Sequence, residues 1–133
     1  MQCEFAFLCD YAEQDRKLHA VGIGWDTIYS ATTPAKHPMM CFVARLKGTA
    51  AEKGSKDISI RILDADGEDV ISPIDQQLGF EVQPPKLTGY LNIVAQFGGV
   101  DFKKYGSYAI HLVVQGNEMA SVPFEVSLLP TTA

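Results

Sequence analysis

The chain has 133 residues, of which 47% are hydrophobic and 20% are charged, the usual proportions of a globular domain. This composition excludes disordered, collagen-like and coiled-coil proteins, and we expect a single domain over residues 1–133. The net charge is -5 and the lysines and arginines are scattered along the chain, never more than two together, which argues against nucleic acid and against an anionic membrane as partners.

The N-terminal segment reads as a strand rather than as a targeting signal. An acidic residue, Glu4, stands where a signal peptide needs positive charge, and no apolar run approaches the roughly 18 residues of a membrane-spanning helix. Three cysteines, Cys3, Cys9 and Cys41, are an odd number without regular spacing, which favours free buried thiols. We therefore predict a cytoplasmic protein with no metal site and no cofactor.

The first predicted strand runs from Cys3 to Cys9 and places Phe5 and Phe7 on its inward face. Residues 11–17 are polar and form a turn. Residues 18–31 then predict a long central strand, in which Gly22 and Gly24 leave one face nearly bare.

Two prolines in residues 32–38 predict an ordered crossing between two sheets. The next strand, Met39 to Lys47, is apolar on both faces, so we expect it to be central in its sheet. Isoleucines alternate over residues 58–62, and Asp64 to Asp69 has the chemistry of a hairpin turn. A weaker extended segment continues to Phe80.

Three further strands complete the chain. Tyr90 to Phe97 and Tyr105 to Val114 alternate apolar and polar residues, and a turn at residues 115–118 leads to the last strand, Ala120 to Leu129. This last strand is predicted to point Val122, Phe124, Val126 and Leu128 inward. Pro123 cannot donate a ladder hydrogen bond and therefore belongs on a sheet edge.

About eight short strands, with frequent turns and no helical periodicity over ten residues, predict an all-β fold. We expect an antiparallel β-sandwich of immunoglobulin-like or related Greek-key topology, with a β-barrel as the alternative. The segment Gly106 to Tyr108 resembles the entry to the penultimate strand of immunoglobulin-like sandwiches.

Eight segments spread over nearly the whole chain form a recognisable set: Leu8–Ala12, Lys17–Ile23, Asp26–Ile28, Pro34–Pro38, Arg45 with Leu46, Asp64–Gly67, Asn92 and Tyr105–Tyr108. Together they resemble a family of small bacterial proteins classed as a domain of unknown function. This resemblance implies no activity and no catalytic residues.

No motif in the sequence predicts catalysis. Gly22 and Gly24 lie inside a predicted strand and lack the third glycine of a dinucleotide-binding loop. Asp64 to Asp69 resembles the start of a calcium loop, but the bidentate glutamate at loop position 12 is missing. The three histidines have no metal-binding or catalytic spacing. We assign no catalytic residue and regard an enzymatic role as less favoured than a binding role.

The candidate binding surface is a sheet face of mixed apolar and polar character. If the strands that contain Cys41, Asn92 and His111 are neighbours, their outward sides combine apolar residues with few charges, as protein interfaces do. The alternative is that a loop over residues 31–38 covers this face. The residues assigned to it are Arg45, Asn92, Val94, His111 and Val113.

A second candidate site combines Trp25, Asp26 and His37, which lie near the predicted crossing. The leading hypothesis is a non-enzymatic binding or assembly module that binds a protein partner or self-associates, without nucleic acid or membrane. The alternative hypothesis is a small-ligand-binding protein or hydrolase that uses His111 or His37 with nearby carboxylates.

Overall fold

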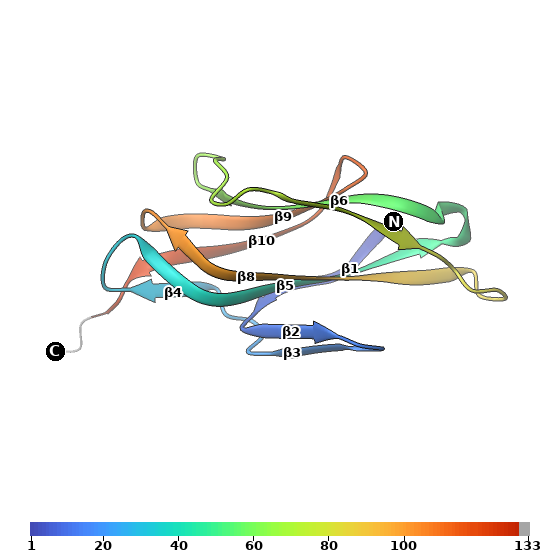
Figure 1. Ribbon diagram of the computed structural model, residues 1–133, viewed down its shortest axis with the longest axis horizontal. Coiled ribbons are helices and arrows are strands. Elements are labelled where there is room, and N and C mark those ends of the chain that lie inside the picture. The colour runs from blue at the N-terminus through green and yellow to red at the C-terminus, as the bar shows by residue number, and fades with distance from the viewer. Residues whose placement is uncertain (131–133) are drawn as a thin grey trace.

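The computed structural model describes residues 1–130 and confirms an all-β, sandwich-like fold (Figure 1). Two sheets pack face to face, and a small hairpin lies against the outer face of one of them. Residues 1–130 contain no α-helix, and their one helical element is the short 3-10 helix η1, Ala50–Glu52. Residues 1–130 form ten strands rather than about eight, because the predicted strand over residues 18–31 is divided into two and the predicted turn over residues 11–17 contains another strand.

The first sheet, here called sheet A, has three antiparallel strands in the order β1-β5-β8. Its long central strand carries apolar side chains on both faces, as the sequence predicts, because one face meets the core and the other meets the hairpin. The bounds are β1 Gln2–Cys9, β5 Ala35–Thr49 and β8 Thr88–Phe102.

The second sheet, here called sheet C, has five strands in the order β4-β10-β9-β6-β7. All its pairs are antiparallel except β4 with β10, which is parallel. The bounds are β4 Thr27–Ser30, β6 Gly54–Asp64, β7 Ile74–Phe80, β9 Gly106–Val114 and β10 Asn117–Leu128.

The main core fills the space between the two sheets. Fully buried side chains from both sheets meet there, and aromatic rings pack edge to face near one end, where the Phe102 and Phe124 centroids are 5.7 Å apart. Burial of this apolar surface is the main force that stabilises the sandwich. The largest contributors include Phe42, Met40, Leu46, Ile60, Ile62, Ile93, Ile110 and Leu112.

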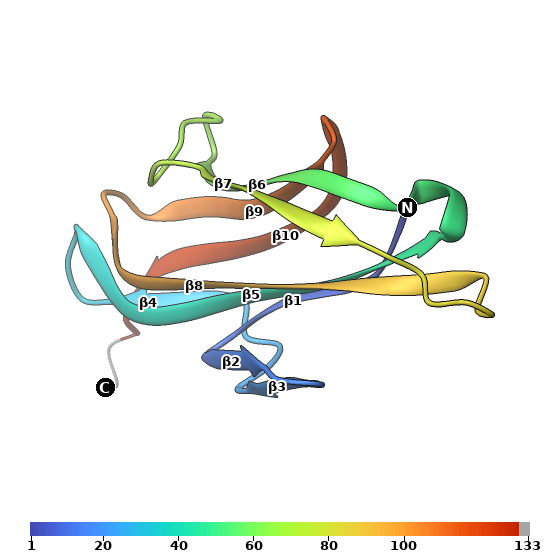
Figure 2. The ribbon, with the colours of Figure 1, turned by 45° about the vertical axis from the view of Figure 1, so that its right-hand side comes forward.

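The hairpin consists of β2, Tyr11–Gln14, and β3, Leu18–Val21. It lies on the side of sheet A that faces away from sheet C, as Figures 1 and 2 show. Ala12 is buried there with Cys41 and Val43 of β5, and the side-chain amide of Gln96 donates a 3.0 Å hydrogen bond to the Ala12 carbonyl. The hairpin therefore forms a second, smaller core outside the sandwich.

The structure corrects the inward face of the first strand. Ala6 and Leu8 face the main core, whereas Phe5 and Phe7 lie on the opposite side. The register of β1 against β5 shifts between Cys3 and Phe5, so that Cys3 also packs against the main core. Alternation fixes which side chains share a face, but the choice of face depends on packing partners elsewhere in the chain.

The predicted central strand over residues 18–31 is also wrong. Its first part is β3 of the hairpin and its last part is β4, an edge strand of sheet C. Gly22 and Gly24 have φ values of +72° and +92°, in the left-handed region that breaks an extended strand. An added Cβ at Gly22 would also lie 2.1 Å from a carboxylate oxygen of Asp10.

The C-terminal strands agree more closely with the prediction. Tyr108, Ile110, Leu112 and Val114 are buried on one face of β9. In β10, Phe124 and Val126 are buried as predicted, but Leu128 is 61% exposed because the strand end passes beyond the core. On one side of β10, Pro123 lies opposite Ala109 of β9. On the other side, the pairing with β4 begins only at Glu125, so β10 is an unpaired edge at the proline, as predicted.

Candidate functional site

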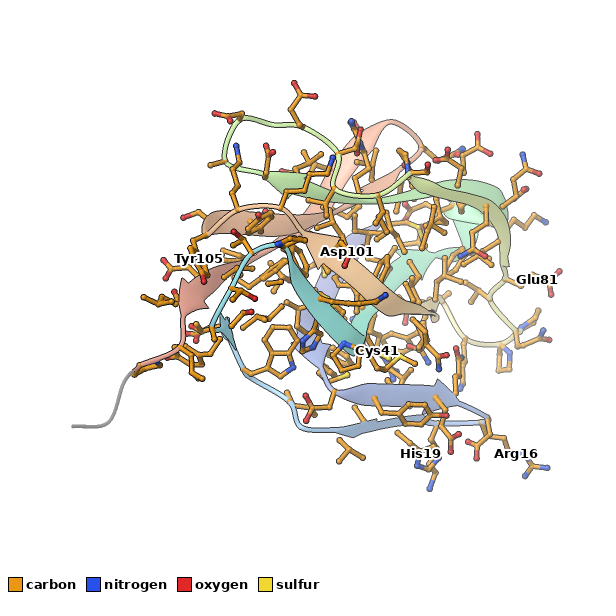
Figure 3. The ribbon with its side chains drawn as sticks, turned by 60° about the vertical axis from the view of Figure 1, so that its left-hand side comes forward. Arg16, His19, Cys41, Glu81, Asp101 and Tyr105 are labelled. Carbon is orange, nitrogen blue, oxygen red and sulfur yellow. The ribbon has the colours of Figure 1, made fainter. Side chains whose placement is uncertain are left out.

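The hairpin covers only part of sheet A, and the remaining part is the candidate site. In Figures 1 and 2 the ends of β5 and β8 near Thr49 and Thr88 extend beyond the hairpin tip. Figure 3 shows Arg16 and His19 of the hairpin projecting away from the sandwich. We call this uncovered surface the open face and define it by Phe5, Arg45, Lys47, Tyr90 and Asn92.

Strand alternation and register explain why these side chains share one surface. Arg45 lies opposite both Phe5 of β1 and Asn92 of β8, and Lys47 lies opposite Tyr90. Their neighbours along β5, Ala44 and Leu46, point into the main core. The five side chains therefore stand in two adjacent rows across the sheet.

The open face combines aromatic rings with cations. The guanidinium carbon of Arg45 lies 3.8 Å from the centroid of the Tyr90 ring, a cation–π contact that leaves only the other face of the ring for a ligand. Phe5 and Tyr90 are 40% and 45% exposed, and the Phe5 ring stacks on Phe7 at 5.8 Å. The surface thus presents two partly exposed aromatic rings, each of which already packs on one neighbour, Phe7 for Phe5 and the Arg45 guanidinium for Tyr90.

The electrostatics of the open face differ from those of the whole chain. β5 contains three basic residues and no acidic one, and the single acidic residue of β8, Asp101, lies near the other end of that strand. Within residues 1–130, neither Arg45 nor Lys47 has a carboxylate partner. Neither cation is held in an ion pair, although Arg45 lies over the Tyr90 ring and Glu52, which pairs with the N-terminal ammonium, lines the same hollow as Lys47.

Asn92 adds a polar group to the same surface. Its Oδ1 is buried and accepts no hydrogen bond from residues 1–130. Such an acceptor is costly to leave unpaired, but its burial keeps it out of reach of a ligand on the open face, so we assign it no ligand contact.

The face predicted from the sequence is divided between two sheets. Arg45, Asn92 and Val94 are in sheet A, but His111 and Val113 are on the outer side of β9 in sheet C. The strands that contain Cys41 and Asn92, β5 and β8, are neighbours as assumed, but the assumption is wrong for the His111 strand, because β9 pairs with β6 and β10. Val94 packs against the hairpin core, so the covering element is the hairpin and not residues 31–38.

The second predicted site brings Trp25 and His37 together. Their ring centroids are 5.6 Å apart, and Trp25 also packs edge to face on Phe124. Trp25 Nε1 and His37 Nε2 are both buried without a hydrogen-bond partner among the described residues. Burial lowers the pKa of His37 and therefore favours the neutral imidazole. The Asp26 carboxylate instead accepts a hydrogen bond from the Thr27 hydroxyl at the surface.

The two histidines named for an alternative hydrolytic site have different surroundings. His111 Nδ1 pairs with Glu118 on the outer side of sheet C. His37 lies against the Trp25 ring, and the largest cause of its lowered pKa is burial.

The cysteines are free thiols. Cys9 and Cys41 are buried opposite each other on β1 and β5, and Cys3 is half-buried. Burial, with a smaller contribution from Cys41, raises the pKa of Cys9 to about 11. Within residues 1–130, no group of three or more histidine, cysteine, aspartate or glutamate side chains could hold a metal ion.

A cleft of about 400 Å³ lies at the end of the sandwich formed by the β6–β7 and β8–β9 connections. Three aspartates and two lysines line it, but Lys104 is bonded to Asp66 at 2.9 Å, and Asp69 is held by Arg61 at 2.7 Å. Asp64 accepts backbone hydrogen bonds within its own turn. These carboxylates stabilise the turn rather than form an open ligand shell.

Residues 4–127 match the sequence model of a family described as a family of unknown function, DUF6941. The chain belongs to this family. The match covers nearly all of the chain and confirms the resemblance to an uncharacterised domain family. No curated protein matches the chain.

A structural comparison identifies the same fold in an alkylpurine DNA glycosylase, AlkC, of Pseudomonas fluorescens, solved on DNA that contains an abasic site analog. The TM-score is 0.52 and the sequence identity 15%, over 77% of this chain and 28% of that chain. The chain therefore corresponds to less than a third of the glycosylase, and the likeness shows a shared fold.

This finding contradicts the predicted partners, which excluded nucleic acid in favour of a protein partner or a second copy. The exclusion rested on net charge and on scattered basic residues. Net charge averages over the whole surface, whereas folding places Arg45 and Lys47 together on a face whose defining residues include no carboxylate.

Residues 1–130 contain no helix with the length and hydropathy needed to cross a bilayer.

Sequence reasoning missed Phe5 as a member of the surface, because it assigned that side chain inward. Tyr90 was placed outward but was not connected to Arg45. The sequence signal that could have indicated a basic surface is that β5 contains lysine and arginine but no acidic residue.

Proposed function

We propose that the chain is a single-domain, non-catalytic binding module whose open face binds anionic ligands that carry aromatic rings. The observation that supports this most strongly is the Arg45 guanidinium stacked on the exposed Tyr90 ring, with Phe5 on the neighbouring strand. Aromatic rings bind the flat face of a ligand, and unpaired cations attract its negative charge.

The shared fold of a glycosylase solved on DNA gives this proposal a nucleotide-like ligand to test. The three free thiols support a cytoplasmic location, because free cysteines persist in reducing compartments. The buried surroundings of His37 and the surface pairing of His111 favour a binding role over a hydrolytic one.

Equilibrium dialysis with adenosine monophosphate and ribose 5-phosphate tests the proposal. The two ligands share the phosphate, but only the first has a ring that can stack. We expect adenosine monophosphate to bind more tightly, and Arg45→Gln to weaken its binding. Equal binding of the two ligands, or binding that Arg45→Gln leaves unchanged, would contradict the proposal.

The matched control is Lys56→Gln, which removes a positive charge from β6 of the other sheet. It should leave the affinity for adenosine monophosphate unchanged. An equal loss in both variants would show that total charge, rather than the open face, controls binding.

A further inference from the structure

We infer that the occupant of the open face is an unpaired segment of single-stranded nucleic acid, a conclusion that rests on the proposed function and makes its ligand class specific. One base would stack on Phe5 and another on the face of the Tyr90 ring that Arg45 does not cover, and the phosphates would contact the guanidinium of Arg45 and the ammonium of Lys47. Three features of the face support this assignment: the separation of its aromatic rings, its exposure and its charge.

The separation of the two rings requires an extended ligand. Phe5 is on β1 and Tyr90 on β8, at opposite edges of the three-stranded sheet, with β5 between them. Two strand spacings place the backbones of these residues roughly 10 Å apart across the sheet. One base cannot stack on both rings, whereas two bases joined by a flexible backbone can.

The form of the surface favours an unpaired strand over a duplex. Both rings lie on a sheet face rather than within an enclosing cavity, and each is close to half exposed. In a duplex the flat faces of the bases are occupied by their stacked neighbours, so only an unpaired strand offers faces to aromatic side chains. Stacking of this kind tolerates any base sequence.

The charge of the face fits the ligand's backbone. Arg45 and Lys47 are in consecutive outward positions of β5, about 6.6 Å apart along the strand. The chain as a whole is acidic, with 16 aspartates and glutamates against 11 lysines and arginines. A polyanion is therefore repelled by most of the surface and attracted to this face, although Glu4 lies at its edge, in the bulge of β1.

Two phosphate contacts give a specific salt dependence. For a single strand, the logarithm of the association constant falls with the logarithm of salt concentration with a slope of about -0.7 per neutralised phosphate. Arg45 and Lys47 together predict a slope of about -1.4, and removal of either predicts about -0.7.

The experiment is fluorescence anisotropy of labelled oligothymidylates of one, three, six and twelve nucleotides, at salt concentrations from about 50 to about 200 mM. We expect affinity to rise from one to six nucleotides and then to level off. Tyr90→Ala should weaken binding of the six-nucleotide strand by roughly 5- to 150-fold, the range for loss of one stacked base. Lys47→Gln should halve the salt slope.

Matched controls separate local from general effects. Tyr29→Ala removes a tyrosine that is 55% exposed on β4 of sheet C, and Lys56→Gln removes a charge from β6. Neither should change the affinity or the salt slope. Circular dichroism of each variant checks that the sandwich is still folded.

The outcomes distinguish the inference from the proposed function. If one nucleotide binds as tightly as six, and Tyr90→Ala weakens both equally, the binding module stands but the single-strand assignment is overturned. Equally tight binding of a duplex of the same length also overturns the assignment. If neither mononucleotide nor oligonucleotide binds at millimolar concentration, both the inference and the proposed function fail.

Discussion

Gly48 offers a sharp test of how the sandwich is packed next to the open face. An alanine Cβ at this position would lie 2.7 Å from Cζ and 2.9 Å from Cε2 of the Phe80 ring. Phe80 is only 1% exposed, so its ring cannot move aside without disturbing its neighbours. Gly48→Ala should therefore destabilise the protein, even though alanine is otherwise preferred to glycine in a strand.

The expected loss follows from two opposing terms. Overpacking of a filled site costs about 1–3 kcal/mol, and the smaller conformational freedom of alanine in the unfolded chain returns about 0.4–1 kcal/mol. The difference between these ranges is a net loss of unfolding free energy of about 0–2.6 kcal/mol, with a midpoint of about 1.3 kcal/mol. For a domain of this size, that corresponds to a melting temperature lower by roughly 3–10 °C.

Urea denaturation followed by circular dichroism measures the effect, and Gly79→Ala is the matched control. Gly79 is also in a strand, β7, but an added Cβ there has nothing within 4 Å. This control should be neutral or slightly stabilising. If both variants unfold at the same urea concentration, the close approach of Phe80 to Gly48 does not limit packing and our reasoning is refuted.

Three further predictions concern the buried groups. Burial raises the pKa of Cys9 to about 11 and also raises the pKa of Cys41, so iodoacetamide at pH 8 should modify the half-buried Cys3 first and the other two cysteines only when the protein unfolds. Equal modification rates for the three cysteines in the folded protein would contradict this. Because burial lowers the pKa of His37, this histidine binds a proton more readily in the unfolded chain, so the unfolding free energy should fall as the pH drops below about 6.5. Urea titrations at several pH values should show that His37→Gln reduces the dependence of unfolding free energy on pH. An unchanged pH dependence would disprove the link. Ile110→Ala, at a fully buried core position, should cost about 2–5 kcal/mol in the same assay, and a loss below about 1 kcal/mol would be inconsistent with the described core.

The parts of the fold that could be predicted are those with a strong local pattern. The strand β5 was recognisable as central because its residues are apolar on both faces, a pattern that follows from burial on two sides. The alternation of Tyr108 to Val114 identified the buried face of β9, because that strand has the core on one side only.

The hairpin could not be predicted from its own residues. Tyr11 to Lys17 is short and polar, so it read as a turn, and an isolated hairpin of this size has little stability. Its stability comes from contacts distant in sequence, such as Ala12 against Cys41 and the Gln96 hydrogen bond. The same hairpin decides which part of sheet A stays uncovered.

The candidate site was only half predictable for a related reason. Arg45 and Asn92 were correctly placed outward, because alternation along a strand is local information. That His111 belongs to the other sheet depends on strand order, which alternation does not encode. Phe5 was missed because the register shift at Glu4 and the packing of Ala6 and Leu8 decide which face of β1 is inside.

The central claim is that the open face of sheet A binds unpaired nucleic acid. Amide chemical-shift mapping of the isotope-labelled protein, titrated with a six-nucleotide oligothymidylate, tests it most directly. We predict that the largest shifts fall on Phe5, Arg45, Lys47, Tyr90 and Asn92. Shifts concentrated around His111 and Val113 on the outer side of sheet C, or no shifts at millimolar oligonucleotide, would contradict the account.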